Sequence, residues 1–294
     1  MTYAHHDPAD DFDTISRIPS WVTSARPEAL EDVAFLSGAV LSHLHLVLQR
    51  DDVPCAVLRE RLALRAAEAC VAFSGRQERA GELRDVMHLL RPGDLPGPAG
   101  ETCLAWRRAV ERPVSVKALH RALQMHLAVQ IAGWLDAGRP APVTRATMVL
   151  EAVLTEMPRA EVTALILADA ALAQALGWNH LVPLLAAGLK RADLRKRGDD
   201  LRLACHRAVT ASVLEAVHLA TDLARRAAHL KAVAPKLRAK GAGEAVEMFL
   251  TRDAVAPAAL PLPDRAARRL CDRLVTLGAI RELTGRDTFR LYGV

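Results

Sequence analysis

Aromatic residues are scarce in this sequence and make up 4% of its 294 positions. Aromatic and β-branched side chains favour strands, whereas Ala, Leu, Arg and Glu, which dominate this chain, favour helices. Hydrophobic residues make up 51% and charged residues 25%, which excludes a disordered or fibrous chain and leaves room for a sizeable core. The composition therefore predicts a mainly α globular protein.

Cysteine is also rare, and its odd number and scattered positions exclude a scaffold held by disulfides. The five cysteines are Cys55, Cys70, Cys103, Cys205 and Cys271. Each lies within an apolar helical pattern, which is typical of reduced core thiols in a cytosolic protein. The first residues are acidic and lack the basic and apolar regions of a secretory signal peptide. We therefore expect a cytoplasmic protein.

No uninterrupted apolar run is long enough to predict a membrane span. The most apolar stretch, residues 162–189, is interrupted by Asp169, Asn179 and Pro183. A membrane-spanning helix needs a run of about 18 apolar residues. We therefore expect no contact with a membrane.

Motifs of catalytic, metal and phosphate sites are missing as well. No Cys or His pair has zinc-ligand spacing, no Gly-rich segment ends as a phosphate loop does, and no Ser lies in a Gly-x-Ser-x-Gly turn. We expect a protein that is not an enzyme and that holds no metal or cofactor. A deep polar pocket lined by His180, Asp169 or Glu215 would instead indicate an enzyme site in the helical body.

Apolar residues recur at helical spacing over most of residues 21–234, which predicts an irregular multi-helix bundle behind a loose acidic leader at residues 1–20. Three prolines and three glycines predict a loop over 91–100. The tryptophans Trp106, Trp134 and Trp178 are expected to pack in the core, with a pocket as the alternative. The expected helices cover residues 28–48, 56–73, 82–90, 101–110, 116–135, 145–156, 160–176, 182–194 and 200–231.

Positive charge is concentrated in the last quarter of the chain. Residues 225–294 hold fourteen Lys and Arg against seven Asp and Glu, a net charge of +7, whereas residues 1–224 carry a net charge of −2. A confined basic excess is typical of a domain with an acidic partner, most often nucleic acid. A solvated basic surface without a partner is the alternative.

Residues 235–294 follow a different pattern from the bundle. A short helix over 241–250 precedes a proline-rich segment, a second helix over 264–277 that Gly278 ends, and two strand-like runs around Gly285. A helix that leads into a β-hairpin, the wing, is typical of the end of a winged helix-turn-helix domain. The sequence therefore predicts such a domain at residues 235–294.

Basic side chains of this C-terminal domain are the candidate DNA contacts. The helix over 264–277 can present its arginines to bases and phosphates in the major groove, and the hairpin can reach the flanking backbone. Residues 240–244 precede a helix whose free N–H groups can hold a phosphate, although a hinge between domains is the favoured interpretation there. The nine candidates are Arg265, Arg268, Arg269, Arg273, Arg286, Arg290, Lys236, Arg238 and Lys240.

Two resemblances to known families bear on these predictions. Residues 274–286 (LVTLGAIRELTGR) resemble the helix-to-wing junction of bacterial winged-helix modules, including those appended to Fic-type proteins. The catalytic His-Pro-Phe motif of Fic proteins is missing, so this resemblance implies no adenylylation.

The second resemblance covers most of the chain. Three segments, 97–100 (GPAG), 233–244 (VAPKLRAKGAGE) and 288–293 (TFRLYG), are similar to an alphaproteobacterial family described as domain of unknown function 1403. The resemblance implies a bacterial, often plasmid-linked protein and carries no established activity.

These observations together predict a bacterial DNA-binding protein, a regulator or plasmid-maintenance factor. It would bind double-stranded DNA through its C-terminal winged helix and form a homodimer through its helical body. The alternative is a non-enzymatic subunit that binds other proteins in a chromosome- or plasmid-maintenance complex. An enzyme site in the helical body is the third possibility.

Overall fold

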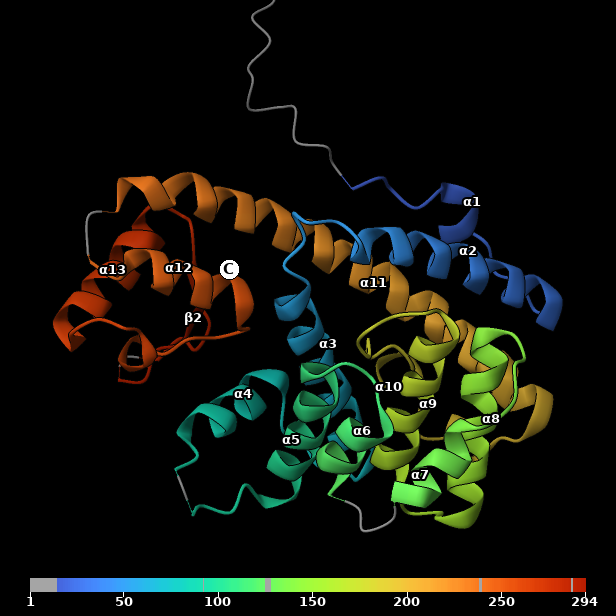
Figure 1. Cartoon of the computed structure of the whole chain (residues 1–294). Helices are drawn as coiled ribbons and strands as arrows, with labels where there is room; N and C mark the ends of the chain where they lie inside the picture. The colour runs from blue at the N-terminus through green and yellow to red at the C-terminus, as the bar shows by residue number, and fades with distance from the viewer. Residues whose placement is uncertain (1–14, 92, 125–127, 238–239, 287) are drawn as a thin grey trace, which may run out of the picture.

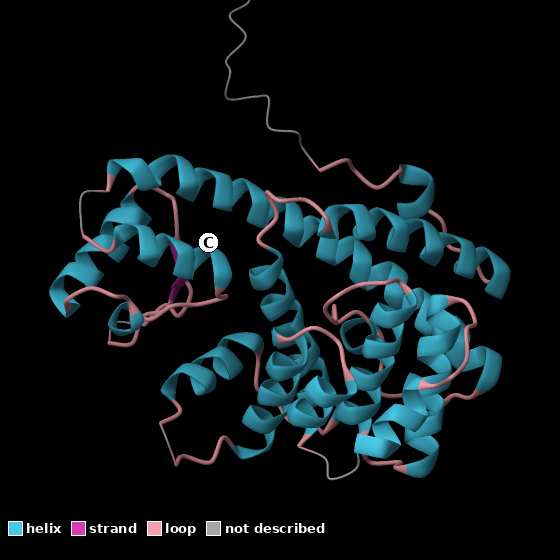
Figure 2. Ribbon diagram, viewed as in Figure 1, coloured by secondary structure: helices cyan, strands magenta, loops and turns pink. Residues whose placement is uncertain are grey.

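The computed structural model describes residues 15–91, 93–124, 128–237, 240–286 and 288–294, and it is mainly helical (Figures 1 and 2). The α-helices are α1 (Ser20–Thr23), α2 (Leu30–Leu48), α3 (Cys55–Phe73), α4 (Ala80–Leu89), α5 (Gly97–Glu111), α6 (Val116–Leu123), α7 (Ala128–Leu135), α8 (Pro142–Glu156), α9 (Glu161–Ala175), α10 (Leu185–Gly188), α11 (Gly198–Val233), α12 (Ala242–Thr251) and α13 (Asp264–Thr276). The 3-10 helices are η1 (Asp193–Arg195), η2 (Ala234–Lys236) and η3 (Pro257–Ala259). Two short strands, β1 (Arg281–Glu282) and β2 (Tyr292–Gly293), form one antiparallel sheet.

Helix α11 is the longest element, with 36 residues, and its 1.5 Å rise per residue makes it about 54 Å long. Its buried residues recur every three or four positions, as in Cys205, Val209 and Val213. One half of α11 packs against α2, α8 and α10, and α12 packs near its other end (Figure 1). This helix therefore joins the helical body to the C-terminal region.

The amphipathic patterns predicted most of these helices. The expected helices over 28–48, 56–73 and 200–231 agree with α2, α3 and α11 to within a few residues. One contiguous core of buried side chains extends from the body into the C-terminal region, where it includes Phe249 and Leu274. A mainly helical fold is therefore confirmed.

The expected helix over 182–194 is wrong, because the structure has only the one-turn α10 and the 3-10 helix η1 in this segment. The buried side chain of Asp169, in α9, accepts hydrogen bonds from the backbone N–H groups of Leu184 and Leu185 and so fixes the start of α10. Gly188 then lies so close to α11 that a Cβ atom there would be 2.5 Å from the carbonyl oxygen of Ala208. Tertiary contacts therefore override the helical pattern of this segment.

Two other boundaries differ from the sequence prediction. The expected helix over 116–135 is divided into α6 and α7, because Gln124 adopts a left-handed backbone conformation (φ 51°) that ends α6. The three residues after Gln124 lie outside the described ranges. The expected loop over 91–100 is shorter, because its last four residues begin α5 with Pro98 in the first turn, where its missing N–H group needs no partner.

Asp169 makes the stability of this fold depend on pH. Its side chain is fully buried and accepts hydrogen bonds from the backbone N–H groups of Leu184 (3.2 Å) and Leu185 (3.1 Å). Burial raises the pKa of Asp169 from 3.8 to about 8, although these two hydrogen bonds favour the charged form. Between about pH 4 and pH 8, the folded protein therefore keeps a proton on Asp169 that the unfolded chain has already released.

We expect Asp169→Asn to remove this pH dependence. Because the ionised Asp169 of the unfolded wild type must take up a proton to fold in this window, the free energy of unfolding should fall as the pH rises, relative to the neutral variant, by at most about 1.4 kcal/mol for each pH unit. Urea unfolding of both proteins at pH 5 and pH 8 measures the difference. An equal gap between the two proteins at both pH values would contradict the prediction.

By length and composition, α2 is the one helix in the described part of the chain that could cross a membrane. The finding is weak evidence, because a core helix of a soluble protein passes the same test, and 39% of the apolar window of α2 is buried. The buried face of α2 packs against α11.

Candidate nucleic-acid interface

The C-terminal region places one helix beside a small sheet (Figure 2). Strand β1 pairs with β2 in antiparallel register, with Glu282 opposite Tyr292. Tyr292 also exchanges two backbone hydrogen bonds with Val255, of 2.8 and 3.0 Å. The chain therefore forms three adjacent extended segments in which β2 lies between Val255 and β1.

Helix α13 has one apolar and one charged face. It begins after Pro263 and buries Ala267, Leu270, Cys271 and Leu274 against the rest of the C-terminal region. As the sequence predicts, Gly278 ends the helix: it adopts a positive φ of 68°, and the N–H of Ala279 donates to the carbonyl of Leu274 (2.9 Å). The chain then turns directly into β1.

A row of three arginines follows the exposed face of α13. Arg265, Arg269 and Arg273 are spaced four residues apart, so they lie above one another on one face at intervals of about 6 Å. All three side chains are exposed and form no hydrogen bond or ion pair with any residue that the structure describes. Arg268, on the adjacent flank, pairs with Asp264 (3.0 Å).

The other candidate cations have different environments. Arg286, between β1 and β2, pairs with Asp85 of α4 (2.7 Å) and is therefore held against the body. Arg290, just before β2, lies 3.8 Å from Glu282 of β1. Lys236 and Lys240 are exposed between α11 and α12, and Arg238 lies outside the described residues. The structure therefore groups the candidates of α13 but does not bring all nine to one place.

A buried cluster of charges joins the C-terminal region to α3 and α4. Asp253 accepts hydrogen bonds from Nε of Arg61 (2.8 Å) and Nε of Arg84 (2.6 Å). The backbone N–H of Asp253 donates to the carboxylate of Glu60 (2.7 Å), and Arg61 also donates to the carbonyl oxygen of Val294. These contacts connect residues that are separated by more than 160 positions in the sequence.

Sequence reasoning missed this cluster, although α3 carries one signal of it. Arg61 falls on the apolar stripe of that helix, at helical spacing from Val57 and Leu58, and it is buried with them. A charged residue within an apolar stripe needs a buried partner of opposite charge. The sequence does not identify that partner as Asp253.

The side chains that would have indicated an enzyme are not together in the structure. Asp169 is fully buried beside α10, Glu215 is exposed and pairs with Arg65 (2.8 Å), and His180 lines a separate cavity. Among the described residues, no three His, Cys, Asp or Glu side chains cluster as metal ligands. Of the tryptophans, Trp106 and Trp134 are in the core as expected, whereas Trp178 is half-buried at the same cavity as His180.

Comparison with known proteins gives a family and no activity. No curated protein matches the chain. The model of one family, described as protein of unknown function (DUF1403), matches residues 6–294, which is nearly the whole sequence. The chain therefore belongs to the DUF1403 family, as the three segments that resemble it predict.

Proposed function

We propose that this protein binds double-stranded DNA through a winged helix formed by residues 235–294, and that it acts as a bacterial regulator or plasmid-maintenance factor. The order of the elements supports the proposal: α12, the extended Val255, η3, α13, β1 and β2 follow one another as in a winged helix, with the last strand in the middle of the sheet. Here the second helix is reduced to the single turn η3.

The observation that carries the proposal is the arginine row Arg265, Arg269 and Arg273. These exposed arginines have no acidic partner among the residues that the structure describes, so they leave a concentrated positive charge on one helix face. In the proposed winged helix α13 would be the recognition helix, so the row would meet phosphates and base edges in the major groove. The positive charge of residues 225–294 would strengthen the attraction.

Fluorescence anisotropy of the full chain with a mixed-sequence duplex tests the proposal. The full chain is required because the C-terminal region shares its core with the body. If the three arginines each contact a phosphate, affinity should fall about 40-fold between 50 and 200 mM salt. No binding at 50 mM salt would contradict the proposal.

The ion pair between Arg286 and Asp85 supplies a second prediction. This pair occupies the hairpin arginine, so we expect Asp85→Asn to release it toward DNA. One additional phosphate contact should steepen the dependence of log affinity on log salt by about 0.9. Glu78→Gln removes one negative charge just before α4, from a pair with Arg76, and serves as the matched control. Equal slopes for the two variants would contradict a role of Arg286 at the interface.

The exposed face of α2 favours a second function, binding of a second copy of this protein. Phe35 and Leu46 are 68% and 62% exposed on this helix, and Trp21 stacks on Phe35 with ring centroids 5.8 Å apart. In a two-fold symmetric homodimer, Phe35 of one copy could pack against Leu46 of the other. Sedimentation of the wild type and of the double variant Phe35→Ser, Leu46→Ser tests this, and a wild type that remains a monomer would exclude it. Unlike DNA binding, such an interface would depend little on salt.

A further inference from the structure

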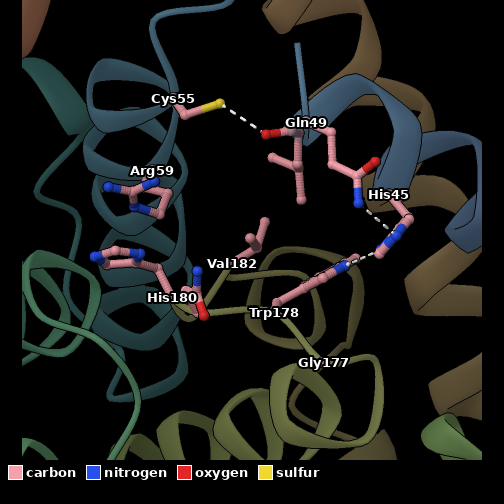
Figure 3. A pocket seen from close by; sticks show the side chains of 10 residues that line it. His45, Gln49, Cys55, Arg59, Gly177, Trp178, His180 and Val182 are labelled. Carbon is pink, nitrogen blue, oxygen red and sulfur yellow. Dashed lines mark hydrogen bonds between the residues drawn. The ribbon is translucent and has the colours of Figure 1, made fainter. Parts of the chain in front are cut away.

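A cavity of about 220 Å³ lies in the helical body, away from the residues assigned to DNA binding (Figure 3). The end of α2, the beginning of α3 and residues 177–182 form its walls. Gln49, Gly177 and Asn179 are exposed and mark its mouth, and Val182 is buried at its inner side. No Asp or Glu side chain is among the described residues that line it.

Arg59 supplies the positive charge of this cavity. Its Nε atom is buried and forms no hydrogen bond, and the guanidinium has no ion pair with a described residue. Burial lowers the pKa of Arg59, which shows that its charge is incompletely solvated. The neighbouring acid, Glu60, does not line the cavity. It faces the C-terminal region, where it accepts a hydrogen bond from the backbone N–H of Asp253. Glu60 attracts Arg59 without contacting it, so the cavity side of the guanidinium has no anionic partner among the described residues.

His180 lies beside Arg59, as Figure 3 shows, and adds a polar group without a charge. Burial, together with the nearby Arg59, lowers the pKa of His180, so its ring is neutral at pH 7. The thiol of Cys55 is also neutral there, because burial raises its pKa. The cavity therefore carries a single positive charge, on Arg59, together with the neutral polar groups of its walls.

The opposite wall is held in one conformation by hydrogen bonds. Trp178 donates from Nε1 to Nδ1 of His45 (3.0 Å), so the ring proton of His45 is on Nε2. The structure places the amide nitrogen of Gln49 2.8 Å from that ring nitrogen. Two N–H groups cannot bond each other, so the Gln49 amide must be turned over for its oxygen to accept this proton. Gly177, with φ 68°, ends α9 and directs the chain so that Trp178 faces the cavity. The indole therefore forms a rigid apolar surface.

We propose that this cavity binds a small monocarboxylate with an apolar body. The carboxylate would form a bidentate ion pair with the guanidinium of Arg59, and the apolar body would contact Trp178 and Val182. One positive charge balances a carboxylate, whereas a phosphate dianion would need a second cation that the cavity does not provide. A volume of about 220 Å³ suits a ligand of this small size.

Titration of the full chain with benzoate, butyrate and inorganic phosphate, each alone, tests this proposal. We expect benzoate or butyrate to change the tryptophan fluorescence saturably and to raise the Tm, and phosphate to do neither. Arg59→Gln should weaken carboxylate binding at least about tenfold, since it removes a charged, two-pronged contact. Arg159→Gln, which alters an exposed arginine elsewhere in the body, should bind as the wild type does.

Two further variants keep the test decisive. Arg59→Lys retains the charge without the planar fork, so it should fold and still bind carboxylate more weakly than the wild type. Trp178→Phe should remove most of the fluorescence response while calorimetry still detects binding. The proposal is overturned if neither carboxylate binds up to about 20 mM, if phosphate alone binds, or if both Arg59 variants bind as tightly as the wild type.

Discussion

Replacing Arg265, Arg269 and Arg273 together with Gln should lower the affinity for duplex DNA about 100-fold or more at 50 mM salt. Each arginine that contacts a phosphate or base edge contributes roughly 1 kcal/mol or more to binding. The variant should also lose most of its salt dependence, because the slope falls by about 0.9 for each lost phosphate contact. Anisotropy titrations at several salt concentrations measure both quantities.

The same triple variant should fold normally. All three side chains are exposed and form no hydrogen bond or ion pair with a described residue, so the Tm should change little. A control variant, in which Arg139, Arg159 and Arg191 of the body become Gln, removes the same charge from exposed positions elsewhere. If the two triple variants lose affinity equally, net charge rather than the α13 surface accounts for binding, and the winged-helix proposal is wrong.

The fold was predictable from the sequence wherever a helix has one continuous buried face. Helix α13 is the clearest case, because its apolar stripe, its arginines and Gly278 together specify its beginning, orientation and end. The segment 182–194 was not predictable, because its single turn depends on Asp169, a residue of the preceding helix. A local sequence pattern indicates which face of a helix is buried. It does not indicate which distant side chains form hydrogen bonds with the backbone of a segment and end its helix.

The two charged sites in the body were not predictable for a related reason. Arg59, Glu60 and Arg61 are consecutive on α3, yet one lines a cavity, one accepts the N–H of Asp253, and one is buried against the carboxylate of Asp253. The cavity around Arg59 is completed by residues 177–182, and the partners of Glu60 and Arg61 come from the C-terminal region. The sequence shows that three charges occupy one helical turn, and only the tertiary structure assigns each of them a role.

Replacing Asp253 with Asn should destabilise the protein more than any other single substitution considered above. Asp253 is buried between Arg61 and Arg84, and its loss would leave two guanidinium groups without their carboxylate. Removing one partner of a buried ion pair costs about 3 to 5 kcal/mol, because the remaining charge stays desolvated. Asp264→Asn, which breaks the exposed pair with Arg268, should cost about 1 kcal/mol or less and serves as the control.

The stability that Asp253 supplies should also disappear in acid. Burial alone would raise the pKa of Asp253, but the guanidinium groups of Arg84 and Arg61 hold it below its ordinary value of 3.8. As the pH falls, the unfolded chain therefore binds a proton at Asp253 before the folded protein does. The stabilisation by the Asp253 charge is complete above about pH 4 and is lost as the pH falls through the lower pKa of the folded state. Urea unfolding from pH 6 to pH 2 should show the gap between the wild type and Asp253→Asn closing only below pH 4. A gap that stays constant across that range would mean that Asp253 stabilises the docked C-terminal region by packing rather than by charge.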